Sequence, residues 1–538
     1  MEAMRVLNNV FSSLAVSSMA VMVLAGSALA APVEVTIRTD QPGAKIDRHI
    51  FGQFAEHLGT GIYDGIWVGK DSQIPNTRGI RNDVVTALKA IKVPDVRWPG
   101  GCFADDYHWR KGIGPADQRP KTVNYLWGRV PESNQFGTHE FMDFIEQIGS
   151  EAYVSGNVGS GSPQEMSDWL EYMTADPSIS SLGAERAANG HPAPFEVPFF
   201  GVGNESWGCG GSMTPEHYAD VYRTYATFAR NYDNAQQLPN GDYDPHGMKR
   251  ISSGPNVDDY HWTEVMMQAS KSQIFSWTID GLSLHFYSGF DNWPPSNAAD
   301  SFGEKAYASV IHSALKMDEL VTKHSAIMDK YDPNKRVALI VDEWGAWYLP
   351  AAGSNPRFLQ QQNSQRDAIL AAVTLNIFTR HADRVRMANI AQMINVLQSM
   401  VLTRGDKMVV TPTYYAFRMY VPFQDATVLP VQYDAGSYIQ GDVHLPRLDA
   451  IAARGKDGKV YVSLTNIDPA QPLEVDLTAT GLKAKSAHGE TLTAPKMDSI
   501  NTFDKPDVVK PVAISAKSSG GKLMLKLAPE SVTVVVVE

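Results

Sequence analysis

Eight short apolar runs alternate with helix-length segments over most of the chain. A run of this length bounded by turn residues is typical of a strand buried on both faces. The runs cover residues 50–54, 93–98, 152–158, 199–204, 250–253, 281–287, 337–343 and 386–392. The segments between them predict helices, for example 82–91, 137–148, 163–173, 215–231 and 365–380. Strand and helix alternating eight times predict an α/β fold, a (β/α)8 TIM barrel.

The pattern changes after a last predicted barrel helix at 413–420. Short alternating or apolar runs follow, separated by Gly, Pro, Asn and Asp, at 460–464, 473–477, 523–527 and 532–537. This pattern predicts a C-terminal all-β sandwich of the jelly-roll kind. An early strand at 33–38 is expected to pair with it. We therefore expect an N-terminal strand segment at 31–48, a catalytic barrel at 49–424 and a β-sandwich at 425–538.

The first 30 residues have the pattern of an export signal. Arg5 precedes a mostly apolar stretch at 14–24, and Ala28-Leu29-Ala30 fits a small-x-small cleavage site. The apolar stretch is short for a membrane span, and no other transmembrane candidate follows. The sequence therefore predicts a signal peptide at 1–30, an exported protein that is periplasmic or secreted, and no membrane partner after the signal is removed.

Charge and motif content narrow the function. The formal net charge of −12 argues against non-specific nucleic-acid binding, which needs a basic surface. The sequence contains neither a CxxC nor an HExxH metal motif and no GxSxG elbow of a serine hydrolase. The two cysteines, Cys102 and Cys209, are expected either to form a disulfide or to remain two buried thiols, since sequence alone does not give their separation.

Two glutamates close apolar runs and are the strongest candidates for chemistry. Glu205 follows the fourth run, and Glu343 ends the seventh. Parallel barrels keep their reactive groups at the carboxyl ends of the strands, so both acids are expected at the same edge. Two such acids can divide glycoside hydrolysis between a proton donor and a nucleophile. Asn204 directly precedes the first acid and is expected to hydrogen-bond the substrate 2-hydroxyl.

Several segments in this order resemble glycoside hydrolase family 51, chiefly α-L-arabinofuranosidases. They are residues 51–59, 97–105, 187–192, 201–207, 282–287 and 341–344. The resemblance implies a clan A barrel fused to a β-sandwich and a retaining double displacement. Glu205 would be the general acid/base and Glu343 the nucleophile, with the two carboxyl groups about 5–5.5 Å apart. Two carboxylates and water suffice for this chemistry, so no cofactor or metal is expected.

Further substrate-binding positions follow from the resemblance and from spacing. They are Glu56, Arg97, Cys102, Asn204, Trp207, His285, Tyr287, Trp344 and Gln392. Tyr287 would hydrogen-bond the nucleophile, and His285 lies on the same strand face because it is two residues earlier. Arg97 would hold the nucleophile ionised, while Glu56 and Gln392 would bind the terminal arabinofuranose.

Three of these positions have a second interpretation. Trp207 and Trp344 flank the two acids, and each is expected either to form a wall beside the sugar or to pack in the core. Cys102 stands where many family members have Asn. A thiol is a poor hydrogen-bond partner, so Cys102 is expected to line the pocket rather than to bind the sugar strongly.

The favoured function is an exo-acting α-L-arabinofuranosidase that removes terminal arabinofuranosyl residues from arabinan, arabinoxylan or their oligosaccharides. One alternative is an endo-acting β-glucanase or xylanase of the same family, which would keep Glu205 and Glu343 and change the sugar contacts. Another is a non-catalytic carbohydrate-binding protein on the same barrel. The resemblance also implies self-association as a homo-oligomer, a trimer or hexamer.

Overall fold

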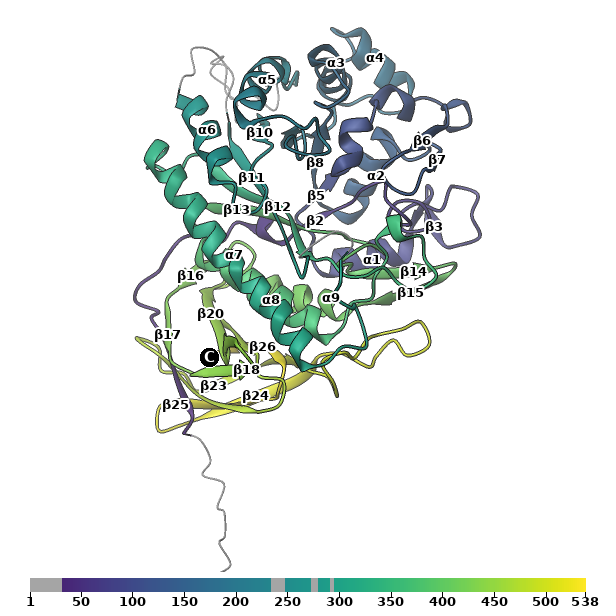
Figure 1. Cartoon of the computed structure of the whole chain (residues 1–538). Helices are drawn as coiled ribbons and strands as arrows, with labels where there is room; N and C mark the ends of the chain where they lie inside the picture. The colour runs from purple at the N-terminus through teal and green to yellow at the C-terminus, as the bar shows by residue number, and fades with distance from the viewer. Residues whose placement is uncertain (1–30, 234–246, 272–278, 291–294) are drawn as a thin grey trace, which may run out of the picture.

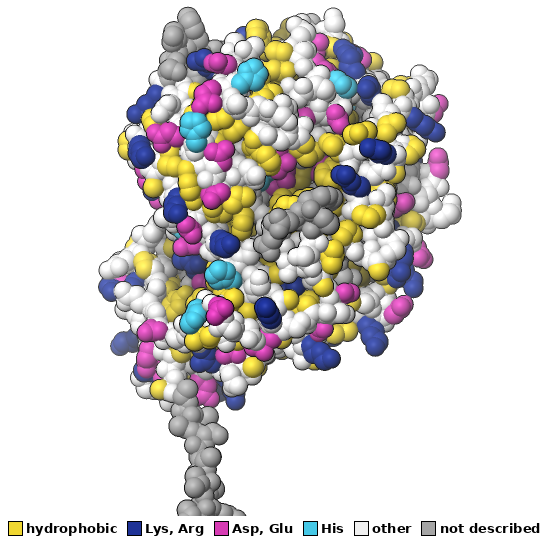
Figure 2. Space-filling view, in the orientation of Figure 1, with side chains coloured by type: hydrophobic (Ala, Val, Ile, Leu, Met, Phe, Trp, Pro, Cys, Tyr) yellow, Lys and Arg dark blue, Asp and Glu magenta, His cyan; other side chains and the backbone are white. Residues whose placement is uncertain are grey.

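The computed structural model describes residues 31–233, 247–271, 279–290 and 295–538. The predicted signal segment 1–30 lies outside these residues. None of the helices in the described ranges is long and apolar enough to cross a membrane. On the face shown in Figure 2, Lys and Arg side chains are interspersed with Asp and Glu and form no continuous basic surface.

Eight parallel strands close into a barrel, as the apolar runs predict. Their order around the barrel is β10-β11-β12-β13-β2-β5-β8-β9. Their bounds are β2 Gly52–Phe54, β5 Asp95–Trp98, β8 Glu151–Gly156, β9 Phe199–Val202, β10 Lys249–Ser252, β11 Gly281–Ser288, β12 Ala338–Ala346 and β13 Val385–Ile390. The predicted (β/α)8 barrel is therefore confirmed.

Helices surround the barrel, as Figure 1 shows. Their bounds are α1 Asn82–Ala90, α2 Thr138–Ile148, α3 Pro163–Thr174, α4 Ser181–Ala188, α5 Pro215–Phe228, α6 Tyr260–Lys271, α7 Glu304–Tyr331, α8 Gln365–Arg380 and α9 Pro412–Tyr420. Local sequence sets several of their ends. In α3 the side chain of Ser162 accepts a hydrogen bond from the backbone of Glu165, and proline occupies the first turn. Helix α2 ends at Gly149, which has a φ of 72°.

A small apolar cluster fills the barrel interior. Its side chains come from five of the eight barrel strands and are Tyr153, Phe199, Ile251, Ala338, Ile340 and Met387. None of them is the last residue of its strand, so the cluster closes the barrel beneath the carboxyl ends of the strands. The carboxyl ends are therefore free to carry polar side chains on a rigid base.

The C-terminal part is a β-sandwich, seen below the barrel in Figure 1. The strand order is β16-β20-β21-β26-β23-β24-β25-β22-β1-β17. The bounds are β1 Val33–Ile37, β16 Thr427–Leu429, β17 Val431–Tyr433, β20 Leu448–Arg454, β21 Val460–Asn466, β22 Leu473–Ala479, β23 Ser486–Leu492, β24 Val512–Ser519, β25 Lys522–Leu527 and β26 Ser531–Val537. Strand β1 lies between β22, to which it is parallel, and β17, to which it is antiparallel.

Short hairpins and 3-10 turns complete the chain and shape the loops at the barrel ends. The hairpin strands are β3 Asn76–Thr77, β4 Ile80–Arg81, β6 Thr122–Asn124, β7 Val130–Glu132, β14 Val401–Arg404, β15 Lys407–Val410, β18 Ser437–Gln440 and β19 Val443–Pro446. Two 3-10 turns matter below, η1 at Arg48–Phe51 before β2 and η2 at Cys102–Asp106 after β5.

The sandwich packs on the barrel through α7, α8 and α9. The hydroxyl of Tyr307 on α7 donates to the carbonyl of Ile467 at 2.7 Å. Asp449 on β20 accepts hydrogen bonds from Asn376 and Arg380 on α8. Apolar residues of both parts belong to one continuous core, Val532 among them. The two parts therefore share buried surface and form a single packed body.

Candidate active site

Glu205 and Glu343 meet at the carboxyl end of the barrel. One oxygen of each, together with a ring nitrogen of His285, lies within 4.8 Å of the others. Glu343 is part of β12, and Glu205 lies three residues past β9. The φ of Glu205 is 39°, a left-handed conformation that is uncommon for residues other than glycine and that concentrates at functional sites. This spacing is that of a retaining pair, because an inverting pair leaves room for a water molecule between the acids.

Both oxygens of Glu343 accept strong hydrogen bonds. Arg97 donates from Nη1 to Oε1 at 2.7 Å, and Tyr287 donates from its hydroxyl to Oε2 at 2.7 Å. The Glu343 side chain is only 5% exposed, so these bonds act in a region of low dielectric. Two donors aimed at one carboxyl suit an anionic nucleophile.

Glu205 has a different environment. Burial raises its pKa, His285 opposes that effect by hydrogen bonding, and the nearby Glu343 carboxylate raises the pKa further. The His285 Nδ1 atom lies 3.0 Å from Glu205 Oε1. Glu205 therefore favours its protonated form, whereas Arg97 contacts the carboxylate of Glu343. Unlike environments of this kind suit one carboxyl group to donate a proton and the other to act as an anion.

His285 lies among three acids. Its Nδ1 atom is also 3.5 Å from Glu343 Oε2, and its Nε2 atom is 3.2 Å from Asp342 Oδ1. Burial lowers the pKa of His285, but Glu343, Asp342 and Glu205 outweigh that effect and raise it to about 10. His285 is therefore a cation at neutral pH and carries a proton on both ring nitrogens.

Asp342 is a site residue that the sequence analysis did not single out. Its side chain is 1% exposed, accepts a 2.7 Å hydrogen bond from the Tyr153 hydroxyl and lies 3.5 Å from Arg97 Nε. Burial alone would raise its pKa, but Arg97 and His285 hold that pKa well below its usual range. The register between β12 and β13 shifts between Val341 and Trp344, so strict alternation is broken and Asp342 and Glu343 both reach Arg97.

Glu56 forms a second buried carboxylate at the same end of the barrel. Its oxygens accept hydrogen bonds from the backbone of Phe103 at 3.0 Å, from Trp127 Nε1 at 2.9 Å and from Gln392 Nε2 at 2.9 Å. Burial, and then Glu343, raise the pKa of Glu56 to about 7. A Cβ atom on Gly101 would lie 2.8 Å from Glu56 Oε1, so only glycine allows the loop this close.

Asn204 directly precedes Glu205, and its amide group contacts Arg97, which also contacts Glu343. Its Oδ1 accepts from Arg97 Nη2 at 2.5 Å, and its backbone N–H donates to Asp105 at 3.2 Å. Because Arg97 takes the oxygen, the amide nitrogen is the end left to meet a substrate hydroxyl; its partner is Cys209 Sγ at 3.8 Å, a weak acceptor.

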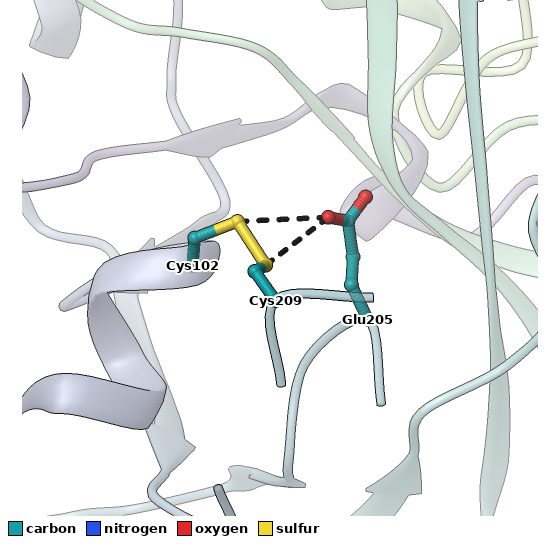
Figure 3. Close-up of side chains that lie close together, drawn as sticks. All are labelled: Cys102, Glu205 and Cys209. Carbon is teal, nitrogen blue, oxygen red and sulfur yellow. Dashed lines mark hydrogen bonds between the residues drawn. A yellow bond between two sulfur atoms is a disulfide. The ribbon is translucent and has the colours of Figure 1, made fainter. Parts of the chain in front are cut away.

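The two cysteines form a disulfide, which decides between the two states left open by the sequence. Their Cα atoms are 5.5 Å apart. The bond joins η2, after β5, to the segment after β9, and Figure 3 shows it against the carboxyl group of Glu205. Cys102 therefore has no thiol with which to bind the sugar.

For Trp344 the structure decides between the two interpretations given above. Trp344 is 1% exposed and its ring packs against Phe378 of α8 and Phe417 of α9, outside the barrel, so a wall beside the sugar is wrong for this residue. Trp207 is partly buried against the main core. Trp127, which contacts Glu56, was missed because it lies in the β6–β7 loop, where no strand or motif marks it. Trp347 was also missed, and its ring lies edge-on to Tyr287 at 5.2 Å.

In the part of the chain that the structure describes, two groups of side chains could each offer three ligand atoms to a metal ion, and neither suits one. In the group Cys102, Glu205 and Cys209, both sulfur atoms are used in the disulfide. In the group Glu205, His285 and Glu343, the imidazole is a cation that donates to carboxylates, whereas a metal needs its neutral form.

A large cavity lies at the other end of the barrel. It has a volume of about 1670 Å³ and is lined by α2 and by residues that precede β8 and β9, such as Ser150 and Pro198. His191, from the segment 187–192 that carries part of the family resemblance, lies on its wall. Glu205 and Glu343 lie at the opposite, carboxyl end, so this cavity is separate from the candidate active site.

Comparisons with known proteins agree with this geometry. Residues 87–275 match the model of the alpha-L-arabinofuranosidase 1 domain, and residues 342–531 match that of the alpha-L-arabinofuranosidase C-terminal domain. The chain is 45% identical over 501 residues to the intracellular exo-alpha-L-arabinofuranosidase of Bacteroides ovatus. The aligned region covers 93% of this chain and 94% of the relative. The chain belongs to the α-L-arabinofuranosidases of glycoside hydrolase family 51. It is a glycoside hydrolase.

Solved structures of this family have the same fold. The GH51 arabinofuranosidase of Xanthomonas axonopodis pv. citri superposes with a TM-score of 0.89 at 53% identity, covering 94% of this chain and 100% of that one. The α-L-arabinofuranosidase of Thermotoga maritima in its arabinose complex gives a TM-score of 0.80 at 30% identity, with the same coverage of 94% and 100%.

The comparisons contradict one prediction. The Bacteroides ovatus relative is named intracellular, so the predicted export to the periplasm or medium is wrong. The prediction depended on residues 1–30 alone, which lie outside the described structure. A single basic residue before a short apolar stretch is a weak signal, because such stretches also occur without export.

Proposed function

We propose that this α-L-arabinofuranosidase acts from chain ends and releases terminal arabinofuranosyl residues from arabinan, arabinoxylan or their oligosaccharides. The pair of acids within 4.8 Å of one another supports the hydrolytic chemistry. The observation that carries the exo mode is the buried Glu56 held by Trp127 and Gln392, a sugar contact that an endo-acting enzyme would change. Glu205 has a raised pKa and Glu343 is held by Arg97 and Tyr287. The names of the relatives from Bacteroides ovatus and Bifidobacterium longum, both exo-arabinofuranosidases, support the same mode of action.

The reaction proceeds in two displacements. Glu343 attacks the anomeric carbon while Glu205 gives its proton to the departing glycosidic oxygen, which leaves a glycosyl ester on Glu343. Glu205, now ionised, takes a proton from water as that water attacks the same carbon. The ester bond breaks, Glu343 is restored as a carboxylate, Glu205 is protonated again, and the sugar leaves with its original anomeric configuration.

The remaining polar groups recognise the terminal sugar. The Asn204 amide shares Arg97 with Glu343 and is assigned to the 2-hydroxyl, where a hydrogen bond can strengthen in the transition state. Glu56, fixed by Trp127 and Gln392, is assigned to the hydroxyls at the far end of the ring. Buried polar groups of this kind discriminate strongly against sugars that leave them unpaired.

Two further expectations belong to this proposal. Family resemblance favours self-association into a trimer or hexamer, which analytical ultracentrifugation of the purified enzyme would measure. The division into segments 31–48, 49–424 and 425–538 is retained as the proposed domain organisation.

A panel of aryl glycosides tests the function. We expect wild-type enzyme to hydrolyse 4-nitrophenyl α-L-arabinofuranoside and to leave the β-D-xyloside and β-D-cellobioside nearly untouched. Glu343→Ala should abolish turnover, because the nucleophile is lost. Main activity on the cellobioside would instead indicate an endo-glucanase. No turnover of any of the three by folded wild-type protein would indicate a carbohydrate-binding protein.

A further inference from the structure

The two oxygens of the Glu205 carboxyl group have unlike neighbours. Oε1 lies 3.0 Å from His285 Nδ1. Oε2 lies 3.4 Å from Cys209 Sγ and 3.7 Å from Cys102 Sγ, as Figure 3 shows. Within the described part of the chain these sulfur atoms are the polar contacts of Oε2. The protonated His285 donates to Oε1, so the transferable proton of Glu205 belongs on Oε2, the oxygen beside the disulfide.

A disulfide sulfur carries no hydrogen and cannot donate a hydrogen bond. It can only accept one, weakly, from a protonated carboxyl group. The disulfide therefore covers Oε2 with a surface that does nothing to stabilise the carboxylate anion. Hydrogen-bond donors at that position would stabilise the ionised form of Glu205 and lower its pKa.

The same bond fixes the loop that carries Glu205. It ties η2 to the segment after β9, four residues past the acid. Asp105 of η2 makes a second tie, since its side chain accepts from the backbone of Asn204 at 3.2 Å and of Val158 at 2.9 Å. The loop thus remains anchored to η2 when the disulfide opens, and the fold is expected to survive.

We propose that the Cys102–Cys209 disulfide is a positioning group for the acid/base, which keeps the proton-bearing oxygen of Glu205 free of donors, so that the redox state of this bond sets the proton-donating strength of the enzyme. The proposal rests on the proposed role of Glu205. In addition to linking two loops, the cysteines would then control how readily Glu205 donates its proton.

Reduction changes the chemistry at Oε2 in a defined way. A dithiol reductant attacks one sulfur, the protein S–S bond breaks, and a second attack releases the reductant as its cyclic disulfide. Two electrons and two protons end on the enzyme as two thiols. Cys209 is exposed, so the reductant reaches the bond directly. Each thiol is a weak S–H donor beside Oε2, which stabilises the Glu205 carboxylate and lowers its pKa.

Apart from the two thiols that reduction creates, the charged groups around Glu205 are the same in both redox states. They are His285 from β11, Glu343 from β12 and Arg97 from β5. None of them is bonded to the disulfide. A change in the protonation of Glu205 on reduction is therefore attributable to the sulfur atoms.

The first test compares oxidised and dithiothreitol-reduced wild-type enzyme over a range of pH. The alkaline limb of kcat/KM reports the loss of the Glu205 proton. We expect reduction to move this limb to lower pH by about 0.5 unit or more. At a pH above the limb, α-1,5-arabinobiose should lose more rate than 4-nitrophenyl α-L-arabinofuranoside, since only the poor leaving group needs a proton. Mass spectrometry after thiol alkylation confirms the redox state.

Two double variants separate donor chemistry from tethering. Cys102→Ala with Cys209→Ala removes the bond and adds no donor, whereas Cys102→Ser with Cys209→Ser removes the bond and adds two hydroxyl donors. We expect the serine pair to have the lower alkaline limb, below that of oxidised wild type by about one unit. Circular dichroism and thermal melting check that both pairs are folded.

The outcomes are distinct. Equal alkaline limbs in oxidised, reduced and variant enzymes overturn the proposal and leave the disulfide a purely structural link. Equal shifts in the alanine and serine pairs overturn it as well, because tethering alone would then explain the effect. In either case the proposed function remains supported if the oxidised enzyme hydrolyses the arabinofuranoside and Glu343→Ala does not. An inactive oxidised wild type would reject the proposed function itself.

Discussion

At the scale of the residue, His285 decides how the site responds to pH. It is a buried cation that donates to Glu205 and lies close to Glu343 and Asp342. This hydrogen bond lowers the pKa of Glu205 and partly offsets the effect of burial. The positive charge of His285 thus keeps the pKa of Glu205 from rising as far as burial alone would raise it. The same charge offsets the negative charges of Glu343 and Asp342.

Replacing this histidine should shift the pH profile. In His285→Gln the cation is lost, so the pKa of Glu205 rises and the alkaline limb of kcat/KM moves to higher pH by about one unit. Tyr287→Phe is a matched control, because its hydroxyl contacts Glu343 and not Glu205; it should lower kcat with the alkaline limb in place. An unmoved alkaline limb in His285→Gln would contradict the assigned electrostatics.

Removing the acid should separate substrates by their leaving groups. Glu205→Ala should slow hydrolysis of α-1,5-arabinobiose by about 10²–10⁴-fold and that of 4-nitrophenyl α-L-arabinofuranoside much less, since nitrophenolate leaves without a proton. Parallel kcat/KM measurements on the two substrates provide the check. Equal losses on both would assign the proton-donating role elsewhere.

The sequence pointed to the proposed catalytic pair but not to all of the residues that support it. Glu205 and Glu343 are visible because each closes an apolar run, and the structure brings them together with Arg97, His285 and Tyr287. Asp342 was hidden because alternation along a strand turns neighbours to opposite faces, and only the register shift in β12 brings it to the site. Trp127 comes from a loop, whose path no periodicity encodes.

At the scale of the element, the barrel strands follow from apolar runs because each is buried on both faces. The predicted strand at 50–54 is shortened in the structure to Gly52–Phe54, since residues Arg48–Phe51 form a 3-10 turn capped by the side chain of Asp47. The packing between strands is set by small residues at close contacts, which a pattern of apolar and polar positions does not reveal.

Gly281 at the start of β11 is one such contact. A Cβ atom there would lie 2.6 Å from Ile340 Cγ1 and 3.3 Å from Ile251 Cγ1, inside the barrel. We expect Gly281→Ala to destabilise the enzyme by about 1–3 kcal/mol through overpacking. Gly43→Ala is the matched control, because the atoms nearest to its added carbon lie 3.4 Å away and its backbone is not left-handed. Urea denaturation followed by fluorescence measures both, and equal stabilities would contradict the packing argument.

At the scale of the whole molecule, the joint between barrel and sandwich contains an unusual acid. Glu530, between β25 and β26, is 3% exposed, and its Oε1 atom has no hydrogen-bond partner among the described residues. Burial, and then Asp498, raise its pKa to about 9, while Arg366 of α8 opposes them. The carboxyl group is therefore protonated in the folded enzyme at neutral pH and ionised in the unfolded chain.

This acid should make stability depend on pH. Between about 4.5, the ordinary pKa of a glutamate, and about 9, the unfolded chain binds fewer protons here, so Glu530 lowers stability progressively as pH rises. Glu530→Gln should then raise the melting temperature at pH 8 and change it little at pH 4.5. Calorimetry at both pH values measures this, with Glu474→Gln on the outer side of β22 as control. An equal effect at both pH values would argue against a protonated Glu530.

The placement of β1 has a consequence for how the enzyme is made. This strand leaves the ribosome first, yet its neighbours β22 and β17 are synthesised hundreds of residues later. At ordinary rates of translation it waits on the order of tens of seconds with both of its edges unpaired. An open β edge invites pairing with other chains. A nascent chain of this enzyme thus carries an unpaired β1 until the C-terminal domain has been synthesised, and pairing between nascent chains competes with folding during that interval.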